Sequence, residues 1–200
     1  KLGGSLLRTP DLKGWLDAFA QFGDGKVVIV PGGGVFADAV RDAQAKTGID
    51  DATAHQMALV AMDQYATLMT GLNEDLVMAS SVLEIAELRL QNKAIVWKPS
   101  EMVLAEKDLP VSWDLTSDSL AAWFADKLNA QHLLIVKSIS PSHAEKVEVR
   151  VGNLDSRLRL TKCSQDLNLN LKDSSRTGGN INVQVSCSAG SAWTILVPAQ

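Results

Sequence analysis

Two glycine-rich turns carry the residue types best suited to bind an anion. They comprise Gly3, Gly4 and Ser5 in the first turn and Gly32, Gly33 and Gly34 in the second. Lys1 precedes the first turn, and the second separates an apolar run at 27–30 from a helical pattern that begins at Val35. Glycine lets main-chain N–H groups approach a ligand closely, and a helix N-terminus adds partial positive charge. The pattern favours a phosphate-binding pair, although a steric need for glycine at a strand–helix turn would explain the second turn equally well.

A third polar segment, Asp114-Leu-Thr-Ser-Asp118, stands at the start of a predicted helix. Asp, Ser and Thr are favoured at helix N-termini, where their oxygens accept hydrogen bonds from main-chain N–H groups. Capping requires one such residue, and this segment has four. The segment therefore indicates a carboxylate placed against lysines and substrate at a phosphate site, with helix capping as the alternative.

Alternating strands and helices must position these segments. Helices are predicted over 11–22, 35–46, about 51–72, 82–91 and 117–129, and strands over 27–30, 77–79, 94–97 and 132–137. Apolar strands that alternate with helices predict an α/β fold, a three-layer, mostly parallel sheet with helices on both faces. Ligands bind such sheets beyond the carboxyl ends of the strands. Both glycine turns, Lys98, Asp114 and Lys137 are expected at that edge.

Helix ends and buried positions give further expectations. Thr9 is a predicted cap for the first helix, Gly48 ends the second, and Asp50 or Asp51 caps the third. Met57, Met62 and Met69 of the third helix are predicted to fill the core. His55 is expected to be a half-buried structural histidine, with a substrate contact as the alternative.

Composition bounds the class of protein. The chain has 200 residues, of which 46% are hydrophobic and 21% charged, and a formal net charge of −4. The mildly acidic balance argues against nucleic acid as the main partner, and no run is long and apolar enough to span a bilayer. Residues 1–140 carry 12 Lys and Arg against 18 Asp and Glu, whereas residues 145–200 carry 7 against 5. Together with a change to short alternating segments, this difference predicts two domains, 1–140 and 145–200.

The second domain is predicted to be a small antiparallel β module. Apolar residues alternate with polar ones at 147–151, 158–160 and 181–185, as in half-exposed strands. Both cysteines of the chain, Cys163 and Cys187, lie in this part. A disulfide between them would contribute about 2–4 kcal/mol, whereas a reducing cytosol would keep them as thiols. No metal site is predicted, because no histidine or further cysteine accompanies them.

The strings Lys1-Leu-Gly-Gly-Ser5, Pro31-Gly-Gly-Gly34 and Asp114-Leu-Thr-Ser-Asp118, in this order and spacing, resemble the amino acid kinase family. The resemblance covers about residues 1–138 and is greatest to the aminomethylfuran phosphate kinase subgroup. It implies ATP and Mg²⁺ as cofactors, a small acid or phosphomonoester as the phosphate acceptor, and a homo-oligomer as one assembly to test.

The resemblance also implies a role for each matched residue. Lys1 would neutralise charge on the transferring phosphoryl group, and Asp118 would orient the lysines. The further implied roles are an ATP phosphate cradle at Gly3, Gly4 and Ser5, an acceptor site at Gly32, Gly33 and Gly34, and an acceptor or metal contact at Asp114. Many members of the family have a neutral residue where this chain has Lys137, which we expect to be a catalytic residue that contacts the nucleotide.

After the strand at 132–137 the chain departs from this family, whose members continue into a segment that completes the nucleotide site. Instead, residues 147–163, 181–187 and 193–198 resemble the N-terminal part of the periplasmic chaperone for flagellar P-ring assembly. We therefore expect a kinase-like domain truncated at both ends, with impaired turnover. The alternative function is a non-enzymatic binding module for a flagellar P-ring protein. The first domain is expected in the cytoplasm, whereas the second resembles a periplasmic protein.

Overall fold

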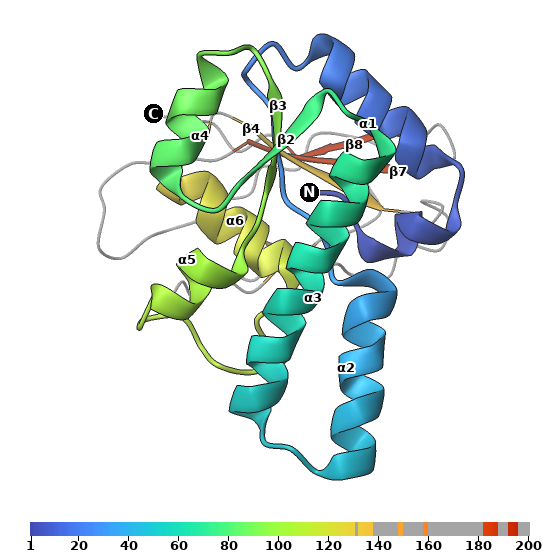
Figure 1. Cartoon of the computed structure of the whole chain (residues 1–200), viewed down its shortest axis with the longest axis vertical. Coiled ribbons are helices and arrows are strands. Elements are labelled where there is room, and N and C mark those ends of the chain that lie inside the picture. The colour runs from blue at the N-terminus through green and yellow to red at the C-terminus, as the bar shows by residue number, and fades with distance from the viewer. Residues whose placement is uncertain (131, 138–147, 150–157, 160–181, 188–191, 196–200) are drawn as a thin grey trace. The chain divides into compact units, whose positions relative to one another are not determined.

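The computed structural model describes residues 1–130, 132–137, 148–149, 158–159, 182–187 and 192–195 (Figure 1). The chain divides into an N-terminal unit, Leu2–Trp113, and a C-terminal unit, Lys1 together with Asp114–Gln200. The residues between the two predicted domains, 141–144, lie outside the described residues, so the domain limits 1–140 and 145–200 remain predictions.

The N-terminal unit alternates helices with short strands, as the sequence predicts. Its elements are the 3₁₀ helix η1 (Gly4–Arg8), α1 (Asp11–Phe22), β1 (Val28–Ile29), α2 (Gly34–Thr47), α3 (Asp51–Leu72), β2 (Leu76–Ala79), α4 (Val82–Arg89), β3 (Ala94–Trp97) and α5 (Ser100–Ala105). The sequence reasoning did not predict η1 or α5. The helix expected from Val35 begins one residue earlier, at Gly34.

A parallel sheet of order β1-β3-β2 forms the centre of this unit. Val28 pairs with Ile95 on one side of β3, and Val77 pairs with the same Ile95 on the other. All four residues of β3 are buried, as expected for a central parallel strand covered on both faces. A parallel bridge between Leu2 and Pro31 continues the pairing beyond β1. The parallel α/β prediction is confirmed for this part of the chain.

Local chemistry places the ends of the long helices where the sequence predicted them. Gly48, with φ of 73°, ends α2, and the Asp50 side chain accepts a hydrogen bond from the Thr53 N–H at the start of α3. The two helices pack side by side (Figure 1). The predicted Thr9 cap is wrong, because Pro10 is the cap residue of α1 and the Thr9 hydroxyl donates to the Leu6 carbonyl instead.

The methionines of α3 differ in how deeply they are buried. Met62 and Met69 are buried as predicted, but Met57 is 37% exposed and does not fill the core. His55 is more buried than expected, at 7% exposed. Among the described residues, no helix combines the length and the apolar character needed to cross a bilayer.

The C-terminal unit contains one described helix and five described strands. They are α6 (Ser117–Lys127), β4 (His132–Lys137), β5 (Glu148–Val149), β6 (Leu158–Arg159), β7 (Asn182–Cys187) and β8 (Ala192–Ile195). β5 pairs with β6, and β7 with β8, in antiparallel fashion. β7 also pairs with β4 in parallel, which the sequence did not predict, so the sheet β4-β7-β8 is mixed.

Candidate functional site

The two glycine turns lie against each other, main chain to main chain, within the N-terminal unit. A Cβ atom on Gly4 would lie 2.2 Å from the Gly34 nitrogen and 2.3 Å from its Cα, and one on Gly32 would lie 2.5 Å from the Gly4 nitrogen. No side chain fits at such distances, so both positions require glycine. Gly34 requires glycine for a different reason, because its φ is +55°, in the left-handed region that residues with a Cβ rarely adopt.

Hydrogen bonds from the first residues of the chain fix this contact. The Leu2 N–H donates to the Val30 carbonyl at 2.9 Å, and the Gly32 N–H donates to the Leu2 carbonyl at 2.9 Å. The first turn is thereby added to the end of the sheet, next to the first residue of α2. A helix N-terminus carries partial positive charge and main-chain N–H groups without helical partners. The contact between the turns can therefore accept a phosphate group.

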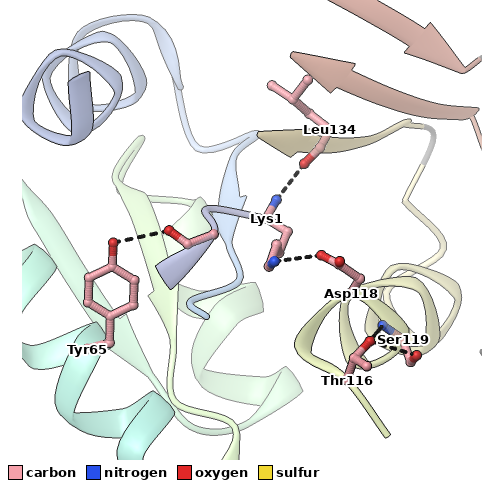
Figure 2. Close-up of polar contacts among 7 residues, drawn as sticks. Lys1, Tyr65, Thr116, Asp118, Ser119 and Leu134 are labelled. Carbon is pink, nitrogen blue, oxygen red and sulfur yellow. Dashed lines mark hydrogen bonds and ion pairs between the residues drawn. The ribbon is translucent and has the colours of Figure 1, made fainter. Parts of the chain in front are cut away.

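Lys1 and Asp118 form a buried ion pair within the C-terminal unit (Figure 2). The Lys1 Nζ lies 2.6 Å from the Asp118 Oδ1, and the two side chains are only 5% and 11% exposed. Charges buried to this degree are retained only when paired. The pair spans 117 positions of the sequence and joins the first residue to the first turn of α6.

The main chain of Lys1 is held as firmly as its side chain. Its nitrogen donates to the Leu134 carbonyl at 2.5 Å, and the Val136 N–H donates to the Lys1 carbonyl at 3.0 Å. Both partners belong to β4, so Lys1 extends the sheet of the C-terminal unit by one residue. A strand position gives the side chain a fixed direction, which here leads to Asp118 (Figure 2).

At the start of α6, one residue caps the helix and another forms the ion pair. Thr116 is the cap, since its Oγ1 accepts a hydrogen bond from the Ser119 N–H at 3.1 Å. Asp118 lies in the first turn of the helix, where its charge also complements the helix dipole. Because Thr116 performs the capping, the burial of Asp118 against Lys1 is not explained by capping.

The other predicted site residues belong to η1, to the segment before α6 and to β4. Ser5 is an exposed residue of η1, and Asp114 is exposed, with its carbonyl accepting the Thr116 N–H at 3.1 Å. Lys137 is the last residue of β4. Cys163 lies outside the described residues, so the disulfide with Cys187 remains a prediction. In the described part of the chain, no three His, Cys, Asp or Glu side chains are grouped to hold a metal ion.

Three side chains of α2 and α3 hold the segment that precedes Asp114. Sequence reasoning singled out His55 but missed Gln44 and Arg41. Trp113 donates from its Nε1 to the Gln44 Oε1 at 2.6 Å, and the Arg41 guanidinium lies 4.6 Å from the Trp113 ring centroid. His55 hydrogen-bonds the main chain of Ser112, and its burial holds the imidazole pKa below the ordinary value. These contacts support the structural interpretation of His55.

Comparison with known proteins identifies the first two thirds of the chain. The amino acid kinase family matches residues 1–141. The chain belongs to the amino acid kinase family. The family match includes both glycine turns, Lys1, Asp118 and Lys137, as the resemblance of the sequence motifs predicted.

One curated relative of this family is a [5-(aminomethyl)furan-3-yl]methyl phosphate kinase from Methanocaldococcus jannaschii, 28% identical over 142 residues. The alignment covers 70% of this chain and 64% of the relative, so this chain spans less than two thirds of the relative's length. The predicted resemblance to the aminomethylfuran phosphate kinases is confirmed, at 28% sequence identity.

A second family, described as the FlgA N-terminal domain, matches residues 128–200. The resemblance of this part to a flagellar P-ring assembly chaperone is thereby confirmed as a family match. The two matched ranges overlap at 128–141, which includes β4. β4 is also the strand that pairs with β7.

Proposed function

We propose that the amino acid kinase part of the chain transfers a phosphoryl group from ATP to a small acid or a phosphomonoester. The observation that carries this proposal is the contact between the two glycine turns beside the N-terminus of α2, where Gly4 and Gly32 leave no room for side chains. Such a surface of main-chain groups suits phosphate oxygens. The buried pair of Lys1 and Asp118 adds a lysine with a fixed direction.

Each matched residue then has a proposed role. Lys1 neutralises charge on the transferring group, Asp118 orients the lysine, and Lys137 contacts the nucleotide. The remaining proposed contacts are those of Gly3, Gly4 and Ser5 with the ATP phosphates, of Gly32, Gly33 and Gly34 with the acceptor, and of Asp114 with the acceptor or the metal. Positioning and charge stabilisation account for most of the catalysis of phosphoryl transfer, so residues with fixed main chains are the ones required.

The glycine turns of the chain suit the phosphates of Mg-ATP, and an exposed carboxylate suits its metal ion. Main-chain N–H groups at glycine turns bind phosphate oxygens, and Mg²⁺ usually takes one or two carboxylates together with phosphate oxygens rather than a complete protein cage. Asp114 is an exposed carboxylate that meets this requirement. When bound, Mg-ATP supplies the phosphoryl group and the divalent charge.

The acceptor proposed here follows the relative named above. A phosphomonoester such as [5-(aminomethyl)furan-3-yl]methyl phosphate is the first compound to test, because the chain aligns with that kinase over residues that include both glycine turns. We propose that turnover is slow, since the sequence after residue 141 no longer matches the kinase family and small misplacement of a nucleotide costs orders of magnitude in rate.

A thermal-shift experiment tests nucleotide binding. Mg-ATP at about one hundred times its dissociation constant should stabilise the folded chain by about 2.7 kcal/mol, which raises the melting temperature by about 5–10 °C. Gly4→Ala should abolish the shift, because its Cβ would collide with Gly34. Gly14→Ala is the matched control, since nothing lies within 4 Å of a Cβ at that position, and it should keep the shift. The proposal fails if millimolar Mg-ATP leaves the melting temperature of the unsubstituted chain unchanged.

A second candidate function rests on the match of residues 128–200 to the FlgA N-terminal domain. We propose as the alternative a non-enzymatic module that binds a flagellar P-ring protein, with the kinase-like part as its scaffold. This alternative would place residues 145–200 in the periplasm, where Cys163 and Cys187 would form a disulfide. Binding of a purified P-ring protein by the whole chain, lost when both cysteines are replaced by serine, would support it. Binding of Mg-ATP without binding of the P-ring protein would favour the kinase.

A further inference from the structure

Tyr65 of α3 contacts the main chain of the first glycine turn. Its side chain is fully buried, and its hydroxyl donates to the Gly3 carbonyl at 3.4 Å, across 62 positions of the sequence (Figure 2). Both residues belong to the N-terminal unit. A buried phenol hydroxyl requires a hydrogen-bond partner, and the structure gives it a main-chain oxygen of the turn that the proposed function uses.

The conformational freedom of this turn explains why such a contact matters. Gly3 and Gly4 both lack a Cβ, so their own side chains do not restrict rotation of the peptide group between them. That peptide is trans and planar, which means that fixing the Gly3 carbonyl also fixes the direction of the Gly4 N–H. The Leu6 N–H donates to the same carbonyl at 3.1 Å, and Tyr65 adds a bond from a different element of the fold.

Contacts on the other side of the turn restrain its position. Gly4 lies against Gly34 and Gly32 so closely that no Cβ fits. These are contacts of shape, whereas the Tyr65 hydroxyl makes a directional bond. Burial raises the pKa of Tyr65 above its ordinary value, so the hydroxyl keeps its proton, and remains a donor, throughout the neutral range.

We propose that Tyr65 is a positioning residue that holds the Gly3–Gly4 peptide in the orientation in which the first turn binds a phosphate oxyanion. This inference rests on the proposed function, because it concerns the same glycine turns. Tyr65 does not touch the ligand; it acts through the main chain of Gly3. Removing the hydroxyl leaves the turn in place but lets its peptide rotate, so part of the binding free energy is spent on ordering it again.

Tyr65→Phe tests this inference, since it removes one oxygen and keeps the ring in the core. The probe is inorganic pyrophosphate, titrated into ¹⁵N-glycine-labelled protein while the amide signals of Gly3 and Gly4 are followed. We expect the loss of one ordinary hydrogen bond to raise the dissociation constant for pyrophosphate roughly two- to tenfold. Met69→Leu is the matched control. Met69 is also a fully buried residue of α3, and the volume-conserving change should leave the dissociation constant within about twofold.

The outcomes separate this inference from the proposed function. If pyrophosphate binds the unsubstituted chain and Tyr65→Phe equally well, the positioning role is wrong and the phosphate-binding turns remain. If pyrophosphate binds neither protein, the proposed function fails and this inference fails with it. If Tyr65→Phe and Met69→Leu weaken binding alike, Tyr65 acts through general packing and the inference is overturned. A structural role alone would lower the melting temperature without changing the dissociation constant.

A second measurement keeps the test decisive if Tyr65→Phe does not fold. Tyr65 is the one tyrosine of the 200-residue sequence, so biosynthetic replacement with 3-fluorotyrosine labels it alone. Its single ¹⁹F resonance should move when pyrophosphate saturates the protein, because the ligand orders the peptide that the hydroxyl contacts. A resonance that stays fixed while the glycine amide signals move would overturn the inference.

Discussion

Replacing Asp118 with asparagine should destabilise the C-terminal unit strongly. The change keeps the size of the side chain but removes the charge that lies 2.6 Å from the Lys1 Nζ, where the side chain of Lys1 is only 5% exposed. Removal of one partner from a buried pair costs about 3–5 kcal/mol, because the remaining charge is left in a poorly solvated place. The cap of α6 stays intact, since Thr116 provides it.

Urea denaturation measures this cost. With a slope of about 2 kcal/mol per molar urea, a loss of 4 kcal/mol lowers the midpoint by about 2 M. Lys1→Met should lower the midpoint by a similar amount, since it leaves Asp118 unpaired. The double variant Lys1→Met/Asp118→Leu should regain most of the loss, because an apolar pair of similar volume often replaces a buried ion pair without cost.

The double-mutant cycle decides whether the two side chains interact. With Asp118→Leu as the second single variant of the cycle, the summed losses of Lys1→Met and Asp118→Leu should exceed the loss of the double variant by several kcal/mol. Additive losses, or a midpoint for Asp118→Asn within about 0.3 M of the unsubstituted chain, which is about 0.6 kcal/mol at the same slope, would refute the reasoning. Such a result would mean that the pair does not form in solution or that water screens it.

Four other predictions follow from single residues. Gly48→Ala should destabilise the chain by about 1–2 kcal/mol, because φ at this helix end is +73°, whereas Gly14→Ala inside α1 should stabilise it by about 0.5–1 kcal/mol; urea midpoints check both signs. The folded state holds the pKa of His55 below the unfolded value of 6.5, so the unfolded state binds more protons and stability should fall as pH drops below about 6.5. In His55→Gln that part of the pH dependence should disappear. The absorbance of tyrosinate should not appear at pH 10 in the folded chain, because burial raises the pKa of Tyr65, and it should appear on unfolding.

The sequence predicted the features that depend on nearby residues. The capping oxygen of Asp50 and the left-handed Gly48 act within one helical turn, so their positions could be found without the fold. The apolar run of β3 likewise predicted a buried parallel strand. The strand predicted at 27–30 is longer than the one observed, because only Val28–Ile29 pairs as a strand. The Val30 carbonyl accepts a hydrogen bond from the Leu2 N–H.

The sequence could not predict the contacts that join distant residues. Nothing in the local pattern brings Gly4 against Gly34, or the hydroxyl of Tyr65 to Gly3, since both depend on the packing of α3 and the register of the sheet. The pairing of Lys1 with Asp118 was expected only from the family resemblance. The physical pattern left open which residue caps α6, and the answer, Thr116, required the side-chain geometry.

A single-turnover phosphoryl-transfer assay tests the central claim most directly. The protein is held in excess over Mg-[γ-³²P]ATP, and [5-(aminomethyl)furan-3-yl]methyl phosphate is supplied as the acceptor. We predict acceptor-dependent label transfer below the ordinary kinase range of about 1–100 per second. The Lys1→Met/Asp118→Leu variant, whose stability should be restored, should transfer none. Absence of transfer by the unsubstituted chain to this acceptor and to other small acids and phosphomonoesters, or equal transfer by the double variant, would contradict the account.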